Sequence, residues 1–522
     1  MYEGACRVFN CKVVKQAIVT GLTGLILLAV LVWIAFYDLT HDQLKSVHIG
    51  CENSEIQMKW ELPLFNQVSG VKITIEGKNT NEEVVLSSWV RHYEFNTGKH
   101  GEKYKVTIKA LYRNGTEGDP YVQDLLYFED DKLPQLPIIR IETVNYEEPT
   151  HEVLSSPYGV GNSTVISNDY VEGVMNFALD DTTSINSRMR IKIRGNSSSV
   201  YSEKKSYKIQ LDDPIDLLRM GNEYADKEWI LLNSGTSLNN HIGEYFSDYF
   251  NMDWTAHMMM VNVVVNGDWK GLYYLAENVK QNNSAGRISD SGFIIENDPY
   301  WWTPNNVSFQ LDALAWGFRY SVIYPANVSS DDNHIEDIRD FMTVIHRNID
   351  REEDDALEYI NVHSFVSWIM VKDIMLIYDS AGSNMYYYMY SLDPDDYSEN
   401  ELFIGPLWDF DSGMVRSYSN PATDWSNPHS LEDYIFSQLF EIESFRREYA
   451  EQWNIISDDL YEDFRDELER LYLEQGEDIE ASRELDAIRW NKKPYQLRDE
   501  IDSDEAFIIQ RIEFIDSSIE EW

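Results

Sequence analysis

Two polar segments in the C-terminal half of the chain carry the side chains that metal-assisted phosphoryl transfer needs. Four residues separate Asp379 from Asn384 in the segment Asp-Ser-Ala-Gly-Ser-Asn, and Asp409 and Asp411 follow the next apolar strand-like run. Such transfer uses one carboxylate near the acceptor hydroxyl, and an Asn and a second carboxylate on the magnesium that bridges the phosphates. The composition and order of the two segments predict this chemistry. A pair of polar turns between buried strands is the alternative.

A glycine- and serine-rich turn supplies candidate phosphate contacts. Arg194 is followed by Gly, Asn and three Ser residues, and the next strand-like run opens with Lys204 and Lys205. Backbone N–H groups in such a turn can point at phosphate, and a lysine on the following strand can reach it. An ordinary hairpin with surface lysines would give the same pattern.

A second hairpin ends in a carboxylate. Asn266 and Gly267 separate two apolar runs, which is a strong hairpin signal, and the second run leads into Glu277. A carboxylate at the end of an apolar strand can bond to a ligand amine or hydroxyl. A strand-end surface Glu is the alternative interpretation.

Taken together, these motifs resemble a known family. The segments IRGNSS, WILLN, NGDWKGLYYLAENV and PLWDFDSG, read in this order, are similar to the CotH (spore coat protein H) kinase family, over about residues 137–520. The resemblance implies an α+β, protein-kinase-like fold with a helical C-terminal extension. It also implies transfer of phosphate from ATP, with Mg²⁺ or Mn²⁺, to Ser or Thr of surface or coat proteins.

The resemblance assigns roles to the acidic candidates. Asp379 would be the catalytic-loop acid that orients the acceptor hydroxyl. Asp409 would be the second catalytic residue and would hold magnesium, with Asn384 as its partner. Since both aspartates are present, the chain is expected to be active rather than an inactive relative.

The resemblance also assigns the nucleotide contacts. Lys204 or Lys205 would touch the ATP phosphates together with Arg194, and the family pattern does not choose between the lysines. Glu277 would lie in the nucleotide cleft, near the adenine or ribose. One departure concerns the Asn pair 239–240, where the family often has Arg-Asn. It leaves any ion pair to the phosphate-binding lysine in doubt, with Glu244 as a possible substitute.

The elements around these motifs divide the chain into several parts. Residues 43–128 show short alternating runs typical of a small β-sandwich, and the pattern around Trp60 and Tyr104 resembles a fibronectin type III module. This module is expected to be a spacer or an adhesive unit. A linker at 129–136 leads into a mixed core at 137–415. Residues 416–522 have helical period and many charges, which predicts a solvated face without chemistry.

The first 37 residues predict a membrane anchor. Residues 17–37 form an uncharged apolar segment long enough to span a bilayer, with basic residues before it and acidic residues after it. This pattern places residues 1–16 in the cytoplasm and the rest of the chain outside the cell membrane. A cleaved signal peptide is the alternative, but no small-residue cleavage site ends the segment.

The composition excludes one class of function. The chain has 522 residues and a formal net charge of −47, so nucleic-acid binding through a broad basic face is excluded. Three cysteines do not make a disulfide scaffold; Cys6 and Cys11 are expected to be unmodified thiols, although acylation is possible there.

Three functions remain open on the sequence alone. The first is a membrane-anchored extracytoplasmic protein kinase, which the three residues Asp379, Asn384 and Asp409 favour. The second is a surface adhesion or scaffold protein with a weak kinase-like fold, which would contact a wall polymer or carbohydrate. The third is a nucleotidyl transferase, because it would use the same metal and cleft.

Overall fold

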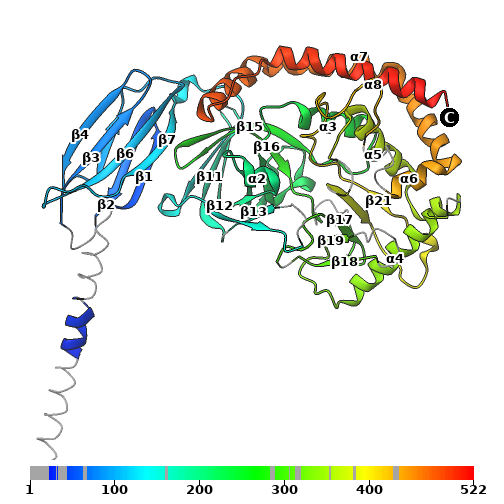
Figure 1. The fold of residues 1–522 in the computed structure, drawn as a ribbon, viewed down its shortest axis with the longest axis horizontal. Helices are drawn as coiled ribbons and strands as arrows, with labels where there is room; N and C mark the ends of the chain where they lie inside the picture. The colour runs from blue at the N-terminus through cyan, green and yellow to red at the C-terminus, as the bar shows by residue number, and fades with distance from the viewer. Residues whose placement is uncertain are drawn as a thin grey trace, which may run out of the picture. The chain divides into compact units, whose positions relative to one another are not determined.

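The computed structural model places most of the chain in two compact units. It describes residues 23–30, 32, 44–62, 67–158, 163–167, 169–180, 182–281, 288–304, 306–311, 319–351, 354–379, 382, 384–426 and 434–522. The first unit comprises residues up to 133 together with 266–269, and the second comprises 134–265 and 270–522. Figure 1 shows the elements of each unit.

The predicted membrane anchor falls mainly outside the described residues. Only 23–30 and 32 of the segment 17–37 are described; they are helical, and their apolar side chains are exposed. Within the described residues, no helix combines the length and the apolar character that a membrane crossing needs. Cys6 and Cys11 also lie outside the described residues. The anchor and the state of these thiols stay predictions.

The first unit is built from two antiparallel sheets. Strands of the first sheet are, in spatial order, β1 (Lys45–Glu52), β2 (Glu55–Glu61) and β5 (His92–Phe95). Strands of the second are β4 (Asn81–Ser87), β3 (Val68–Glu76), β6 (Glu102–Tyr112) and β7 (Tyr121–Tyr127). Alternate residues of β2 and β6 are buried, and Trp60 and Tyr104 belong to the core. The N-terminal region is therefore β-rich, as predicted, and its likeness to fibronectin type III stays a prediction.

The second unit begins with a closed barrel. Its strands are, in spatial order, β11 (Val171–Ala178), β12 (Ser184–Arg194), β13 (Ser206–Ile215), β14 (Asp226–Leu232), β16 (Asp268–Glu277), β15 (Met258–Val265) and β8 (Ile138–Thr143). Met189, Ile191 and Ile193 of β12 are buried in the barrel core, so the residues that alternate with them, including Lys192 and Arg194, face away from it. A short helix, α2 (Ser197–Tyr201), and a two-stranded ribbon of β9 (His151–Ser155) and β10 (Ser163–Ser167) lie beside the barrel.

A five-stranded sheet and the helices complete the second unit. The sheet orders β18 (Ser308–Gln310), β19 (Arg319–Tyr324), β17 (Phe293–Asn297), β20 (Met385–Met389) and β21 (Phe403–Ile404). The helices are α3 (Asn239–Tyr249), α4 (Asn333–Ile349), α5 (Val362–Met375), α6 (Tyr434–Glu441), α7 (Glu443–Arg489) and α8 (Leu497–Ile519). Short 3₁₀ turns cover Asp130–Lys132, Val144–Tyr146, Asn222–Tyr224, Asp354–Tyr359 and Tyr397–Glu399.

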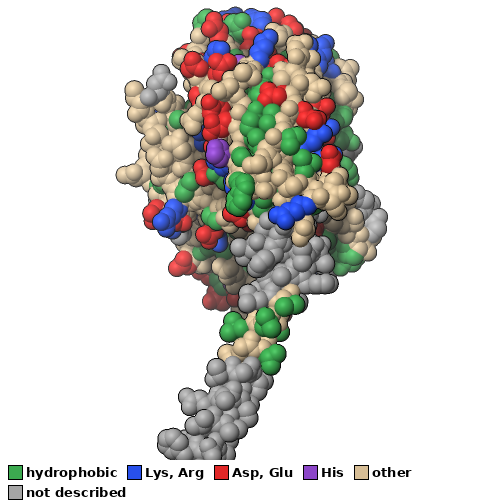
Figure 2. Space-filling model, turned by 90° about the vertical axis from the view of Figure 1, so that its left-hand side faces the viewer, with side chains coloured by type: hydrophobic (Ala, Val, Ile, Leu, Met, Phe, Trp, Pro, Cys, Tyr) green, Lys and Arg blue, Asp and Glu red, His purple; other side chains and the backbone are tan. Residues whose placement is uncertain are grey.

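Helix α5 is the centre of the helical layer. Every residue from Ser364 to Met375 is buried, including the charged Lys372 and Asp373. Most of the other side chains are apolar, which is expected of a helix surrounded by protein. Helices α7 and α8 pack on each other and both contact α5 (Figure 1). The outer face of α7 is charged, as the sequence predicts. Figure 2 shows one face of the molecule, on which acidic and basic side chains are interspersed.

Candidate active site

A polar cavity of about 840 Å³ in the second unit collects most of the candidate residues. Barrel strands β12, β13 and β14 contribute to its wall, as do β17, the segment around 379–384 and the segment 408–412. Its acidic, amide and basic lining residues include Arg194, Lys192, Lys208, Glu296, Asp298, Asp379, Asn384, Asp409 and Asp411. The cavity therefore joins parts of the chain that are more than 200 residues apart.

Asp379 reaches the cavity because α5 ends just before it. The helix stops at Met375, and Leu376 follows in the left-handed region with φ 50°. The backbone N–H of Asp379 then donates to Ser412 Oγ at 2.9 Å, which ties this segment to the one that holds Asp409. The Asp379 side chain is exposed to the cavity. Asn384 lines the same cavity directly before β20.

The segment that carries Asp409 and Asp411 is fixed by the start of α3. Asn239 Nδ2 donates to the carbonyl oxygens of Phe410 at 3.2 Å and Gly413 at 2.8 Å. Asn240 Nδ2 donates to Asp411 Oδ1 at 3.3 Å. The Asn pair that departs from the family pattern therefore positions the aspartate segment, a role that the sequence did not indicate. Glu244, the possible substitute, bonds instead to His257 Nδ1 at 3.1 Å.

The two aspartates of this segment are held in a setting that favours their protonated forms. Burial raises the pKa of Asp409, and the negative charge of Asp379 raises it further, while Lys372 and Arg194 act in the opposite direction. Burial also raises the pKa of Asp411, and the negative charge of Asp409 raises it further. Carboxylates that crowd together in this way favour a nearby cation.

Positive charge lines another part of the cavity wall. Arg194 stands at the end of β12, with its Cζ 5.7 Å from the centre of the Trp408 ring, and its charge opposes the raised pKa of Asp409. Lys192 and Lys208 are register partners on β12 and β13. Lys208 Nζ lies 3.1 Å from Glu228. Arg194 therefore lines the same cavity as Asp409, and its contact with the ATP phosphates stays a prediction.

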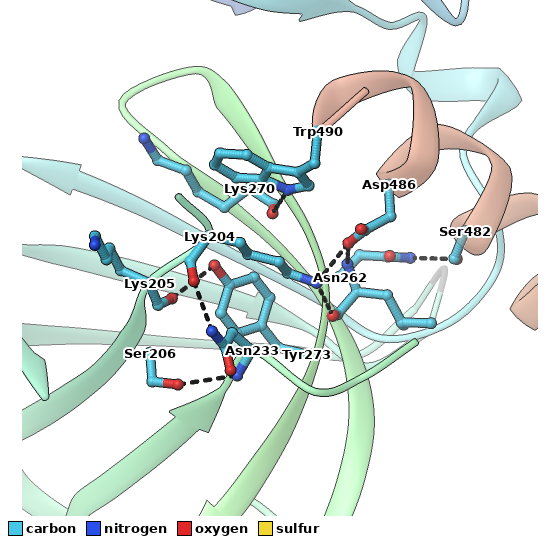
Figure 3. Close-up of polar contacts among 11 residues, drawn as sticks. Lys204, Lys205, Ser206, Asn233, Asn262, Lys270, Tyr273, Ser482, Asp486 and Trp490 are labelled. Atoms are coloured by element: carbon cyan, nitrogen blue, oxygen red, sulfur yellow. Dashed lines mark hydrogen bonds and ion pairs between the residues drawn. The ribbon is translucent and has the colours of Figure 1, made fainter. Parts of the chain in front are cut away.

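The structure places Lys204 and Lys205 outside the cavity lining. Lys204 is buried and donates to Asp486 Oδ2 at 2.5 Å and to the Leu272 carbonyl at 2.6 Å. Figure 3 shows its side chain pointing to α7, whereas Lys205 points the other way; Lys205 Nζ donates to the Ser199 carbonyl at 2.6 Å. Neither ammonium group is brought to Asp379 or Asp409.

Glu277 also stays outside the cavity. It is buried at the end of β16, and its Oε2 accepts a hydrogen bond from the backbone N–H of His257 at 3.1 Å. Its neighbour Asn278 does line the cavity and donates to Glu228 Oε2 at 3.2 Å. At the end of β16, Asn278 therefore lines the cavity in place of the predicted Glu277.

Sequence reasoning missed several charged residues of this region, and Glu296 and Lys372 are the two with the largest pKa changes. Glu296 lines the cavity from β17, and burial together with the charge of Asp298 raises its pKa to about 8. Lys372 lies in α5, is fully buried, and burial lowers its pKa to about 8. A lone Lys-Asp pair inside the apolar run VSWIMVKDIM was the signal that could have identified Lys372.

The candidate metal donors are carboxylate and amide oxygens. Within the described part of the chain, no three His, Cys, Asp or Glu side chains converge closely enough to form a metal site by themselves. Asp409, Asp411 and Asn384 line one cavity, however, and their oxygens are of the kind that Mg²⁺ takes. Mg²⁺ commonly keeps waters and substrate phosphates as its other ligands, so this donor set fits such an ion.

A family comparison identifies the part of the chain that holds the cavity. A model of the family described as CotH kinase protein matches residues 191–515, which is more than half of the chain. The chain therefore belongs to the CotH kinase family. The match begins in β12, so β8 and β11, which help to close the barrel, precede it. No curated protein matches the chain.

The chain was also compared with solved structures, and the similarities are weak. The twitchin kinase region from C. elegans is 10% identical, with 45% of this chain and 40% of that chain covered, at a TM-score of 0.18. A structure titled "Myokine structure" is 14% identical over 16% of this chain and 94% of that chain, at 0.14. The chicken CNTN1 FN1–FN3 domains are 10% identical over 33% and 76%, at 0.14. These scores are too low to support an argument about the fold.

Proposed function

We propose that the protein is an ATP- and magnesium-dependent protein kinase that phosphorylates Ser or Thr of surface or coat proteins. The observation that carries the proposal is the convergence of Asp379, Asn384, Asp409 and Arg194 on one cavity. These residues come from three separate segments. A cavity that did not serve phosphoryl transfer would not require them to converge. Membership of a kinase-like family supports the same function.

In this proposal each residue acts through its position in the cavity. The exposed carboxylate of Asp379 accepts the hydrogen bond of the acceptor hydroxyl and orients it. It takes the proton of this hydroxyl as the new bond to the γ-phosphorus forms and the bond to the β–γ bridging oxygen breaks, so that ADP leaves. Arg194, stacked beside Trp408, contacts the phosphate oxygens with its guanidinium. The cavity volume of about 840 Å³ is within the range of small-molecule sites.

Asp409 would hold the magnesium ion, with Asn384 and Asp411 beside it. Burial, and then the charge of a neighbouring aspartate, raise the pKa of both residues, and a bound divalent cation would offset both effects. When bound, the ion neutralises charge on the phosphates. Asn239 and Asn240 contribute by holding the backbone and Asp411 in place.

Thermal unfolding of the full chain tests the nucleotide and metal part of the proposal. ATP with Mg²⁺ is expected to raise Tm, since a ligand that binds only the folded state stabilises it. Asp409→Asn should abolish this rise without lowering the Tm of the unliganded protein much. An unchanged rise in the variant would remove Asp409 from the metal site.

We further propose that residues 17–37 anchor the protein in the cell membrane, with residues 1–16 in the cytoplasm and the kinase domain outside. The support is the uncharged segment and the charge asymmetry around it. The full-length protein should stay in the membrane fraction after a high-salt wash. A mature soluble form that begins after about residue 37 would show cleavage instead.

A further inference from the structure

Lys372 is a buried charge that the proposed chemistry does not yet use. Its side chain is 0% exposed, and its Nζ has no hydrogen-bond partner among the residues that the structure describes. Its surroundings include the rings of Trp368 and Phe410, whose centres lie 5.1 and 5.5 Å from Nζ. An unpaired ammonium is among the most costly groups to bury. A residue of this kind is expected where its charge has a use.

Lys372 lies beside the segment that carries Asp409: its Nζ is 5.5 Å from the centre of the Phe410 ring, and Phe410 follows Asp409 directly in the chain. The charges that act on Lys372 are those of the candidate active site. Asp409 and Asp379, in this order of size, oppose the lowering of its pKa by burial. In return, Lys372 opposes the raised pKa of Asp409. Both carboxylates line the cavity and Lys372 does not. The lysine therefore lies behind the cavity wall, where it acts on the two aspartates and is not in contact with the cavity itself.

The helix around Lys372 is fixed on its other side. The neighbouring Asp373 accepts hydrogen bonds from Tyr449 Oη at 2.9 Å and from Ser426 Oγ at 2.5 Å. Arg511 Nε donates to the Asp373 carbonyl at 2.8 Å. Because α7 and α8 supply two of these donors, they hold this turn of α5, and the ammonium of Lys372 keeps a fixed position.

We propose that Lys372 is a positioning residue, whose fixed positive charge holds the carboxylates of Asp379 and Asp409 in the arrangement that phosphoryl transfer requires. This inference rests on the proposed kinase function and adds a residue to it. Lys372 itself touches neither nucleotide nor acceptor. Its contribution is to offset the repulsion between two carboxylates that must act close together.

The experiment compares Lys372→Met with Lys204→Met in the full chain. Both replace a fully buried lysine by an apolar side chain of similar length, but Lys204 is paired with Asp486 and Lys372 is not. Lys204→Met leaves a buried carboxylate uncompensated and should lower Tm by at least about 4 °C. Lys372→Met removes an unpaired buried charge, so Tm should stay the same or rise. Its kcat should nevertheless fall about 10²-fold, the effect of a misplaced reacting group, with KM for ATP little changed.

A double-mutant cycle in Tm tests the charge coupling without any turnover. We compare the change in Tm that Asp409→Asn causes in the wild type with the change that it causes in Lys372→Met. The change should be more destabilising in the wild type, because only there does the substitution remove an attraction to the lysine. Equal shifts in the two backgrounds would overturn the proposal. So would a Lys372→Met protein that melts as low as Lys204→Met and turns over normally. If the wild type transfers no phosphate, the kinase function fails, and the cycle still decides whether Lys372 and Asp409 are coupled.

Discussion

Asp486→Ala is expected to destabilise the second unit strongly without touching the nucleotide site. The carboxylate of Asp486 accepts from Lys204 Nζ at 2.5 Å and from the backbone N–H of Leu272 at 3.0 Å. The substitution would leave both donors buried and without this partner. Figure 3 shows that these contacts join the barrel to α7.

The size of the effect follows from the burial of the pair. The side chains of Lys204 and Asp486 are 3% and 2% exposed. Breaking a buried ion pair by removing one partner costs about 3–5 kcal/mol, which corresponds to a fall in Tm of about 4–6 °C for a unit of this size. The affinity for ATP with Mg²⁺ should change little, because neither residue lines the cavity.

Calorimetry and nucleotide titration of the same samples provide the assay. Lys205→Met is the matched control, since Lys205 donates to one backbone carbonyl at 2.6 Å and its loss should cost about 1 kcal/mol. The reasoning is refuted if Asp486→Ala melts within about 2 °C of the wild type and binds ATP at least about tenfold more weakly. That result would return Lys204 to the phosphate-binding role that the sequence suggested.

Three further predictions concern the cavity. Asp379→Asn should reduce transfer by at least about 10²-fold while nucleotide affinity changes little, whereas Asp409→Asn should lose both; equal binding by the two variants in a titration would contradict this division. Mg²⁺ affinity should rise with pH between about pH 5 and 8, because the raised pKa values of Asp409 and Asp411 make protons compete with the ion; a flat calorimetric profile would speak against these ligands. Arg194→Gln should weaken ATP binding about tenfold, as the loss of one charge-assisted contact predicts, with Tm unchanged; a variant that melts early but binds normally would make Arg194 structural.

Local patterns predicted the architecture of the chain well. Alternation in 43–128 indicated a β-rich region, and helical period indicated α6, α7 and α8. The Asn266-Gly267 signal predicted the hairpin between β15 and β16, where both residues have positive φ, 50° and 73°. Such signals act over a few residues, so the sequence contains them directly. Closure of the barrel and the order of its strands depend on distant contacts, which these patterns do not encode.

The candidate site was predictable only in part, for a related reason. Asp379, Asn384, Asp409 and Arg194 stand next to strand and helix ends, and the cavity brings them together. The position of Lys204 depended on Asp486, which is 282 residues away in a helix expected to be free of such contacts.

Two labelled forms of ATP test the central claim most directly. The full-length protein, solubilised in detergent, is incubated with Mg²⁺ and a general acceptor protein, with ATP labelled either at the γ- or at the α-phosphate, and Asp379→Asn serves as the inactive control. The account predicts label in the acceptor from the γ-phosphate alone, in an amount that the control reduces by at least about 10²-fold. Label from the α-phosphate would contradict it and indicate nucleotidyl transfer, and no label from either form would indicate a binding protein with a kinase-like fold.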